Sequence, residues 1–268
     1  MLVWPRSLKP AFTIARDVSP RSELAAAFIL LTRVRLPSTT AEAVPIARCV
    51  WALPIVGAVA GALGAATYYA CSLTGIPSAV SAVWSLAVMV LFTGALHEDG
   101  LADTADGLGG GRSRERKLEI MRDSRIGNFG AIALVLSLAA RGTAIAVLVH
   151  PLRVSITLTV AGALGRAAII VLMLILAPAR TDGLAAGLRE VRAPRAIIGL
   201  AISGLLTLLL LPIALAVCTV VGALLAALVV AFVAHRQIGG YTGDVLGASS
   251  VVTECVVSGL LAGALLNS

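Results

Sequence analysis

The residues that could do chemistry are concentrated between positions 97 and 123. This segment holds seven of the fourteen carboxylates in the chain. Asp99, Asp103 and Asp106 stand at i, i+4 and i+7, so on a helix they would share an arc of about 60° over roughly 10 Å. Carboxylate oxygens are the ligands that hard cations such as Mg²⁺ and Mn²⁺ prefer. The spacing therefore predicts a metal site on these three residues, with Glu98 beside them as a further ligand.

A charged segment of this kind can also be a solvated loop. The regular spacing, and the position of the acids directly after a long apolar stretch, favour the metal site. A zinc site is not indicated, because His97 is the only histidine in the segment and no metal-binding spacing joins the cysteines.

Glycines and basic residues follow the acids and suit phosphate binding. A glycine run offers backbone amides, and guanidinium groups match phosphate oxygens. Acids for a metal beside arginines for phosphate indicate phosphoryl transfer. We predict substrate-binding roles for Gly109, Gly110, Arg112 and Arg122 and catalytic roles for Asp106, Asp123, Arg125 and Asp244. For Arg114, Arg116 and Lys117, anchoring at a membrane surface is at least as good an explanation.

The elements that position these residues must be membrane helices. Hydrophobic residues make up 59% of the 268 and charged residues 13%, with a mean hydropathy of +0.98. A soluble domain is nearer a quarter charged. We therefore predict an all-α, polytopic membrane bundle in a lipid bilayer. The predicted spans are residues 51–73, 76–96, 130–149, 154–177, 196–217, 219–234 and 250–266, with a short interfacial or re-entrant helix at 24–32.

The distribution of basic residues predicts the orientation. With the N-terminus in the cytoplasm, eighteen of the twenty-one Lys and Arg residues face inward, as the positive-inside rule requires. The net charge of +7 therefore reflects topology and does not indicate nucleic-acid binding. We predict one catalytic domain, residues 1–268, with an N-terminal extension at 1–22 and a cytoplasmic active-site segment at 97–129.

Two arginines fall inside predicted spans. Arg141 and Arg166 would be costly in lipid unless they face a polar interior, so a functional role is the default. They are predicted either to bind an anionic substrate or to pair with an acid such as Glu254, which lies in the last span.

At this point a family resemblance becomes visible. The segments HEDGLADTADGLGGG and RERKLEIMRDSRIGNFGA resemble the signature of the cobalamin synthase (adenosylcobinamide-GDP ribazoletransferase) family. Matching pieces elsewhere include PARTDGLAAGL at 178–188 and GGYTGDVLGASSVVTE at 239–254. The resemblance implies a late step of vitamin B12 assembly at the cytoplasmic inner membrane. The implied reaction joins adenosylcobinamide-GDP to α-ribazole or its 5′-phosphate, releases GMP and requires Mg²⁺.

Two other functions remain open at this stage. A CDP-alcohol phosphotransferase also spreads aspartates along a membrane helix, but Leu-Ala-Asp follows Asp99-Gly100 where that family has an Ala-Arg pair. A cation transporter would place its acids near the bilayer midplane. The sequence leaves open whether the protein forms a homo-oligomer.

Overall fold

The computed structural model describes residues 19–34, 44–180 and 193–266. Within these ranges the protein is helical, and the only β-type pairing is an isolated parallel bridge between Pro178 and Tyr241. The prediction of an all-α membrane fold is confirmed. The helices are α1 (Pro20–Leu31), α2 (Ile46–Cys49), the 3-10 helix η2 (Val50–Ala52), α3 (Leu53–Leu73), α4 (Ser78–Thr93), α5 (Leu96–Gly110), α6 (Arg114–Ile120), α7 (Asn128–Leu148), α8 (Pro151–Ile175), α9 (Ala193–Leu210), α10 (Ile213–Ile238) and α11 (Gly243–Leu266).

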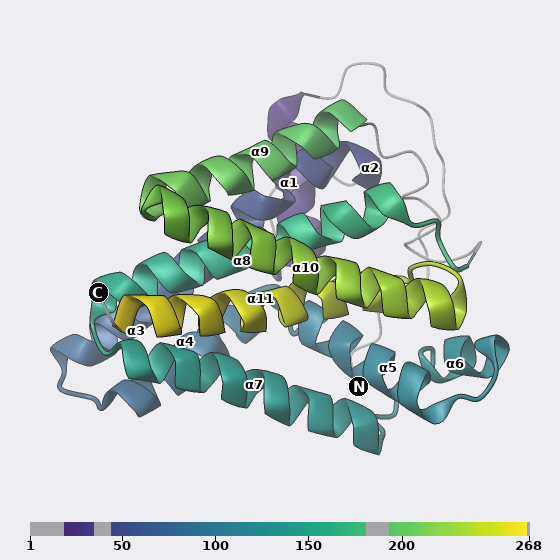
Figure 1. The fold of residues 1–268 in the computed structure, drawn as a ribbon, viewed down its shortest axis with the longest axis horizontal. Helices are drawn as coiled ribbons and strands as arrows, with labels where there is room; N and C mark the ends of the chain where they lie inside the picture. Colours follow the sequence, from purple (N-terminus) through teal and green to yellow (C-terminus); the bar gives the residue numbers. More distant parts are fainter. Residues whose placement is uncertain (1–18, 35–43, 181–192, 267–268) are drawn as a thin grey trace.

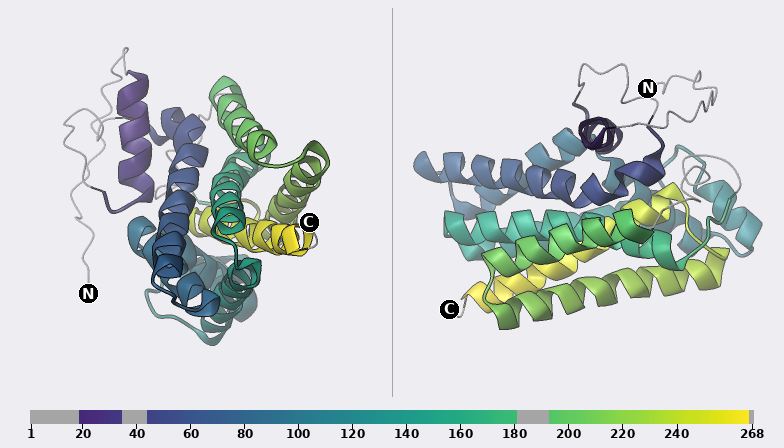
Figure 2. Two further views of the ribbon diagram at one scale, coloured as in Figure 1. Left: turned by 90° about the vertical axis from the view of Figure 1, so that its left-hand side faces the viewer. Right: turned by 90° about the horizontal axis from the view of Figure 1, so that it is seen from above.

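Six helices of the described chain are long and apolar enough to cross a membrane, one of them formed by α2, η2 and α3 together. They run side by side (Figures 1 and 2). The centre is formed by α8 and α11, which are 78% and 72% buried over their most apolar windows, whereas α7, α9 and α10 are under 30% buried. A helix that is apolar all round and still exposed in the monomer has lipid as its natural surroundings.

Two predicted spans have different boundaries in the structure. The break between the fifth and sixth spans lies at Pro212, not at residue 218, because Pro212 caps the start of α10 and cannot continue α9. The sixth span, which looked short in the sequence, is therefore a helix of 26 residues. The second span, predicted at 76–96, is only 16 residues long as α4.

A sharp bend follows α4 and sets the position of the acidic segment. Gly94 and Ala95 both adopt left-handed backbone angles, with φ of 68° and 61°. As a result α5 leaves α4 at 90°, and only the bent pair together would count as a seventh span. Figure 1 shows α5 and α6 at the same end of the bundle as the turn between α10 and α11. The predicted active-site segment 97–129 thus comprises most of α5, all of α6 and the start of α7.

The short N-terminal helix exists, but it begins earlier than predicted. It is α1, which lies across the bundle (Figure 2). Its Glu23 accepts a hydrogen bond from Trp51 Nε1 at 2.8 Å and pairs with Arg195, so α1 is tied to η2 and α9. Residues 1–18 of the predicted extension lie outside the described residues, and the N-terminal orientation stays a prediction.

Candidate active site

The four acids of α5 point to three different surroundings. Asp99 is exposed and Asp103 is half-buried, whereas Glu98 and Asp106 are buried. Glu98 and Asp99 belong to the first turn of the helix, and Asp103 and Asp106 follow in later turns. The three aspartates share one stripe of the helix, as their spacing predicts, but of the four acids only Asp99 and Asp103 are accessible to a ligand from solution.

A third accessible acid comes from the far end of the sequence. Asp244 lies in the first turn of α11, where α11 crosses α5. The two helices touch there: a β-carbon on Gly100 would fall 2.7 Å from the carbonyl oxygen of Asp244. Thr242 Oγ1 donates to Asp244 Oδ2 at 3.1 Å and orients the carboxylate. We call Asp99, Asp103 and Asp244 the open acidic face.

The open acidic face carries an excess of negative charge. Partial burial, followed by the charges of Asp99, Asp244 and Asp106, raises the pKa of Asp103 from 3.8 to about 7. Arg180, at the end of the segment that follows α8, acts in the opposite direction. The helix α5 is not one of the six spans, so this charge does not have to lie in hydrocarbon. A divalent cation would relieve the repulsion among these carboxylates.

The open acidic face fits Mg²⁺ in its donor chemistry. The ligands that the protein supplies would all be carboxylate oxygens, which this hard ion prefers. Among the residues that the structure describes, no group of three or more His, Cys, Asp or Glu side chains lies close enough together to hold a metal ion by itself. Mg²⁺ is commonly held by one or two carboxylates together with water and substrate phosphates. Asp99 and Asp103, one helical turn apart, are the residues that would hold it.

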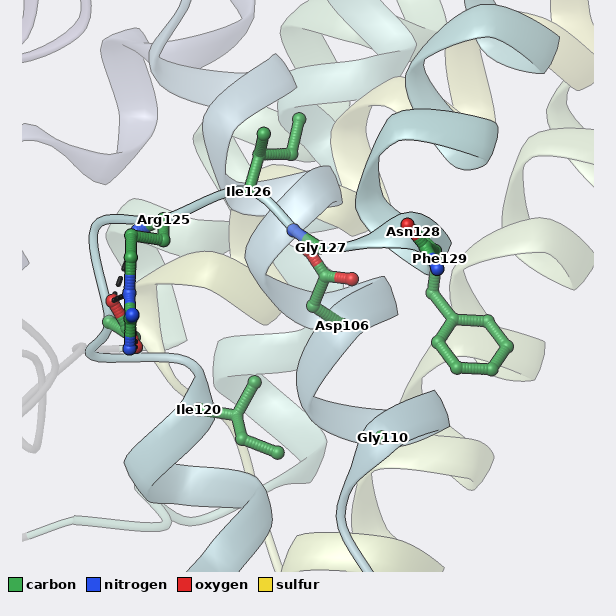
Figure 3. A pocket seen from close by; sticks show the side chains of 9 residues that line it. Asp106, Gly110, Ile120, Arg125, Ile126, Gly127, Asn128 and Phe129 are labelled. Atoms are coloured by element: carbon green, nitrogen blue, oxygen red, sulfur yellow. Dashed lines mark hydrogen bonds and ion pairs between the residues drawn. The ribbon is translucent and has the colours of Figure 1, made fainter.

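Asp106 has a different role from the one that its spacing predicts. Its carboxylate accepts hydrogen bonds from Gly127 N at 2.7 Å and from Gly130 N at 2.9 Å. Figure 3 shows Asp106 beside Gly127. These amides belong to the start of α7, where backbone N–H groups lack partners within the helix. Asp106 therefore caps α7. Each of its oxygens accepts one of these N–H groups, and the expected metal-ligand and catalytic roles of Asp106 stay predictions.

Glu98 also points away from the open acidic face. Arg141 on α7 donates to Glu98 Oε1 at 3.0 Å and to Glu254 Oε2 at 2.8 Å. Arg166 on α8 pairs with the other oxygen of Glu254, and its Nη2 lies 3.5 Å from His97 Nδ1. We call these five residues the buried charge network. They are all buried.

The buried charge network corrects three expectations. Of the two alternatives for Arg141 and Arg166, the structure shows pairing with Glu254. Neither arginine is placed to bind substrate in this conformation, because both are engaged with acids inside the bundle. Glu98 is likewise committed to Arg141, so it is not placed as a metal ligand.

The predicted phosphate-binding segment lies on the other side of Asp106. Gly109 packs under the ring of Phe129, where a β-carbon would come within 2.7 Å of it. Gly110, Asp106, Asp123 and Arg125 help to line a cavity of about 480 Å³ (Figure 3). Asp123 and Arg125 form an ion pair of 2.7 Å, and hydrogen bonding to Arg125 lowers the pKa of Asp123 to about 2. None of Asp99, Asp103 and Asp244 lines this cavity.

Arg112 and Arg122 have exposed side chains at the two ends of the α6 segment. Arg114 and Lys117, interpreted as membrane anchors, instead contact other elements: Arg114 reaches the backbone of Ile238 and Ala179, and Lys117 contacts Gln237.

Sequence reasoning missed Arg180 and His97. Arg180 belongs to PARTDGLAAGL. In the sequence analysis it counts only as one of the basic residues on the cytoplasmic side of the membrane and has no role in the site. For His97, the sequence pattern addresses only zinc binding, which it does not indicate. A signal was present for Arg180, since it is the last basic residue before a gap of eight residues and follows a span directly. Spacing alone could not connect it to Asp103, which is 77 positions away.

Comparisons with known proteins agree with these features. A family model described as cobalamin-5-phosphate synthase matches residues 23–262. The protein of Bradyrhizobium diazoefficiens named adenosylcobinamide-GDP ribazoletransferase is 43% identical over 248 residues, which cover 92% of this chain and 95% of that protein. Proteins of the same name from Mesorhizobium japonicum and Azorhizobium caulinodans are each 42% identical and cover 90% and 87% of this chain, and 93% and 92% of their own lengths. No solved structure matches.

The match extends over α1 to α11 and includes every residue of the open acidic face and of the buried charge network. The chain belongs to the cobalamin-5-phosphate synthase family.

Proposed function

We propose that the protein transfers the phosphocobinamide group of adenosylcobinamide-GDP to α-ribazole or its 5′-phosphate and releases GMP. The observation that carries this proposal is the open acidic face, where Asp99 and Asp103 meet Asp244 from the opposite end of the chain, beside Arg180. The names of the relatives supply the substrates, and the carboxylates supply a surface on which a diphosphate and a divalent cation can be held together.

The chemistry requires one bond to form and one to break. A hydroxyl of α-ribazole attacks the phosphorus next to the cobinamide arm, and the bond from that phosphorus to the bridging oxygen of the diphosphate breaks as GMP leaves. Bound Mg²⁺ would supply charge stabilisation to the diphosphate. In this scheme Asp244 would accept the hydroxyl proton, and its support is that Asp106, the other candidate, already accepts two backbone N–H groups of α7.

We further propose that the site faces the cytoplasm in the inner membrane. The open acidic face lies at the end of the bundle that also carries α6 and the turn before α11 (Figure 1). Most of the Lys and Arg residues between the spans belong to the connections at this end, as expected for the cytoplasmic side.

The test is an assay on the purified full-length protein in liposomes. With adenosylcobinamide-GDP, α-ribazole 5′-phosphate and Mg²⁺, we expect GMP and the joined corrinoid in equal amounts, and neither product when any one component is omitted. CDP-diacylglycerol serves as the competing substrate. Turnover of CDP-diacylglycerol with no GMP from adenosylcobinamide-GDP would overturn the proposal.

A further inference from the structure

The cavity beside Asp106 has walls from three parts of the chain. It is enclosed by the end of α5, the segment that follows α6 and the start of α7, and its volume is about 480 Å³. A cavity of this size can hold a small organic ligand. Three large apolar side chains line it, namely Ile120, Ile126 and Phe129. The ligand that suits this cavity depends on what these side chains and their charged neighbours offer.

The charged side chains that line the cavity already have partners in the protein. Asp106 accepts hydrogen bonds from the backbone N–H groups of Gly127 and Gly130. Asp123 and Arg125 form an ion pair of 2.7 Å. A ligand with a polar edge would have to compete with these interactions or leave its own polar groups unpaired, which is costly. The cavity therefore favours a ligand that is mainly apolar.

The apolar side chains form an exposed surface with an oriented aromatic ring. Ile126 is 60% exposed and Phe129 is 53% exposed. A β-carbon on Gly109 would lie 2.7 Å from Cγ of Phe129 and 2.9 Å from each of its two Cδ atoms, so the backbone of α5 lies against one face of the ring. In the view of Figure 3, Ile120 and Phe129 flank the end of α5. A ring held on one face in this way can stack on a flat ligand with the other.

The cavity and the open acidic face follow one another along α5. Asp103 of the open acidic face stands at i, and Asp106 and Gly110 of the cavity lining stand at i+3 and i+7. Residues with this spacing share one side of a helix, and the rise from Asp103 to Gly110 is about 10 Å. A molecule as long as a nucleoside, lying along this side of α5, would place one end among the acids and the other in the cavity.

We propose that the cavity binds the aromatic base of α-ribazole and leaves its hydroxyl end at the open acidic face. The base of this nucleoside is flat and bicyclic, and its edges carry methyl groups and no N–H donor. It therefore matches the isoleucine side chains and the ring of Phe129. Guanine, the base of the departing GMP, has donors and acceptors along its edges and would need polar partners. This inference rests on the proposed function, because it places the acceptor substrate of that reaction.

A simpler role for the exposed apolar side chains is contact with lipid. Aromatic residues gather where membrane helices meet the bilayer surface, and Phe129 lies in the first turn of α7. In that case, shortening Phe129 or Ile126 would leave the affinity for every nucleoside unchanged. If the cavity holds the base, the same changes weaken the binding of α-ribazole and not the binding of GMP. The two roles are separated by measuring both affinities on the same variants.

The experiment titrates α-ribazole, and separately GMP, into the full-length protein in lipid nanodiscs with Mg²⁺ and no adenosylcobinamide-GDP. We expect Phe129→Ala to raise the dissociation constant of α-ribazole on the order of 10-fold, as loss of base stacking does, and to leave that of GMP unchanged. Phe129→Tyr keeps the aromatic face and should bind α-ribazole much as wild type does. Ile132→Ala is the matched control, since Ile132 is an exposed apolar residue of α7 that does not line the cavity, and it should not change either affinity.

Melting temperatures identify a variant that does not fold. If Phe129→Ala fails to fold, Ile126→Ala takes its place, with a weaker affinity for α-ribazole as the expected result. Wild-type affinity for α-ribazole in the folded variant, equal weakening of GMP binding, or no saturable binding of α-ribazole by the wild-type protein would overturn the inference. The proposed function fails separately: a protein that binds α-ribazole through Phe129 but releases no GMP from adenosylcobinamide-GDP supports the inference and overturns the reaction.

Discussion

Glu98 and Asp99 are neighbours in the sequence, yet they belong to regions with opposite electrostatics. In the buried charge network, two carboxylates face two guanidinium groups, so the charges balance inside the bundle. On the open acidic face, three carboxylates share the charge of Arg180, so the balance is negative. The network joins α5, α7, α8 and α11. The difference indicates that one group of charges holds α5 in place and the other is completed by what binds there.

The largest effect is expected from breaking the buried charge network. Glu254→Ala would leave both Arg141 and Arg166 without their shared carboxylate and should destabilise the protein by about 3–5 kcal/mol. The measurement is thermal unfolding in detergent, together with the amount of folded protein recovered. Asp99→Ala, on the same crossing of α5 and α11 but exposed, is the control and should not lower stability. Wild-type stability of Glu254→Ala would show that the network is not what holds these helices.

The opposite pattern is expected on the open acidic face. Asp103→Asn should lower the rate of GMP release on the order of 100-fold or more, as loss of a transition-state charge does. Its melting temperature should equal or exceed that of wild type. The pKa of Asp103 is raised to about 7, so the charged form is disfavoured in the folded protein, and a neutral amide removes that cost. Normal activity of Asp103→Asn would remove Asp103 from the site.

The same raised pKa predicts how the magnesium requirement depends on pH. A metal must displace the proton from Asp103, so the apparent Mg²⁺ affinity should weaken by up to about tenfold per unit as pH falls below about 7. Without metal, the sign for stability is reversed: the raised pKa means that the stability of the folded state decreases as pH rises from about 4 towards 7. The apparent Mg²⁺ affinity and the stability without metal can both be followed by measuring the melting temperature with and without Mg²⁺ at each pH. A magnesium requirement that does not change between pH 6 and pH 8 would contradict the assignment of Asp103 as a metal ligand.

The sequence was sufficient to predict the class of the fold, whereas the location of the site stays a prediction. Composition alone indicates a membrane bundle, because so much apolar surface has no other place to be buried. The acidic segment follows an apolar helix as predicted, but that helix, α4, counts as a span only together with α5. Pro212 was the missed boundary signal, because the apolar composition is the same on both sides of it.

The partners of individual charges could not be predicted, because they are set by how helices cross. Periodicity places Asp99, Asp103 and Asp106 on one stripe, but it does not reveal that the start of α7 arrives beside Asp106 with two unpaired amides. Nor does it show that Arg141 reaches both Glu98 and Glu254, which are 156 positions apart. Contacts of this kind depend on the 90° bend at Gly94 and Ala95.

A smaller effect is expected at Asp106, which lies between the two regions. Asp106→Ala removes the acceptor for Gly127 N and Gly130 N and should cost about 1–2 kcal/mol of stability, the usual range for a helix cap. Asp106→Asn keeps one acceptor oxygen and should cost less. Total activity should fall only as far as the folded fraction falls. GMP release per folded molecule should therefore equal that of wild type. A loss of turnover equal to that of Asp103→Asn, with the fold intact, would return Asp106 to the catalytic group.

The smallest effect is expected at Arg125, which the sequence placed in the site. Its side chain is 87% exposed, forms an ion pair with Asp123 and lines the cavity together with Asp106. Arg125→Ala should leave the melting temperature at pH 7 unchanged, since an exposed ion pair contributes little. The pKa of Asp123 would then rise from about 2 towards its ordinary value, so the contribution of this pair is present above pH 4 and is lost as pH falls towards 2.

Turnover of Arg125→Ala should stay close to wild type, with Asp123→Asn as the matched variant. A large loss of turnover in Arg125→Ala, with diphosphate binding also weakened, would mean that the cavity beside Phe129 closes onto the open acidic face when substrate binds, and the two surfaces would then have to be treated as one site.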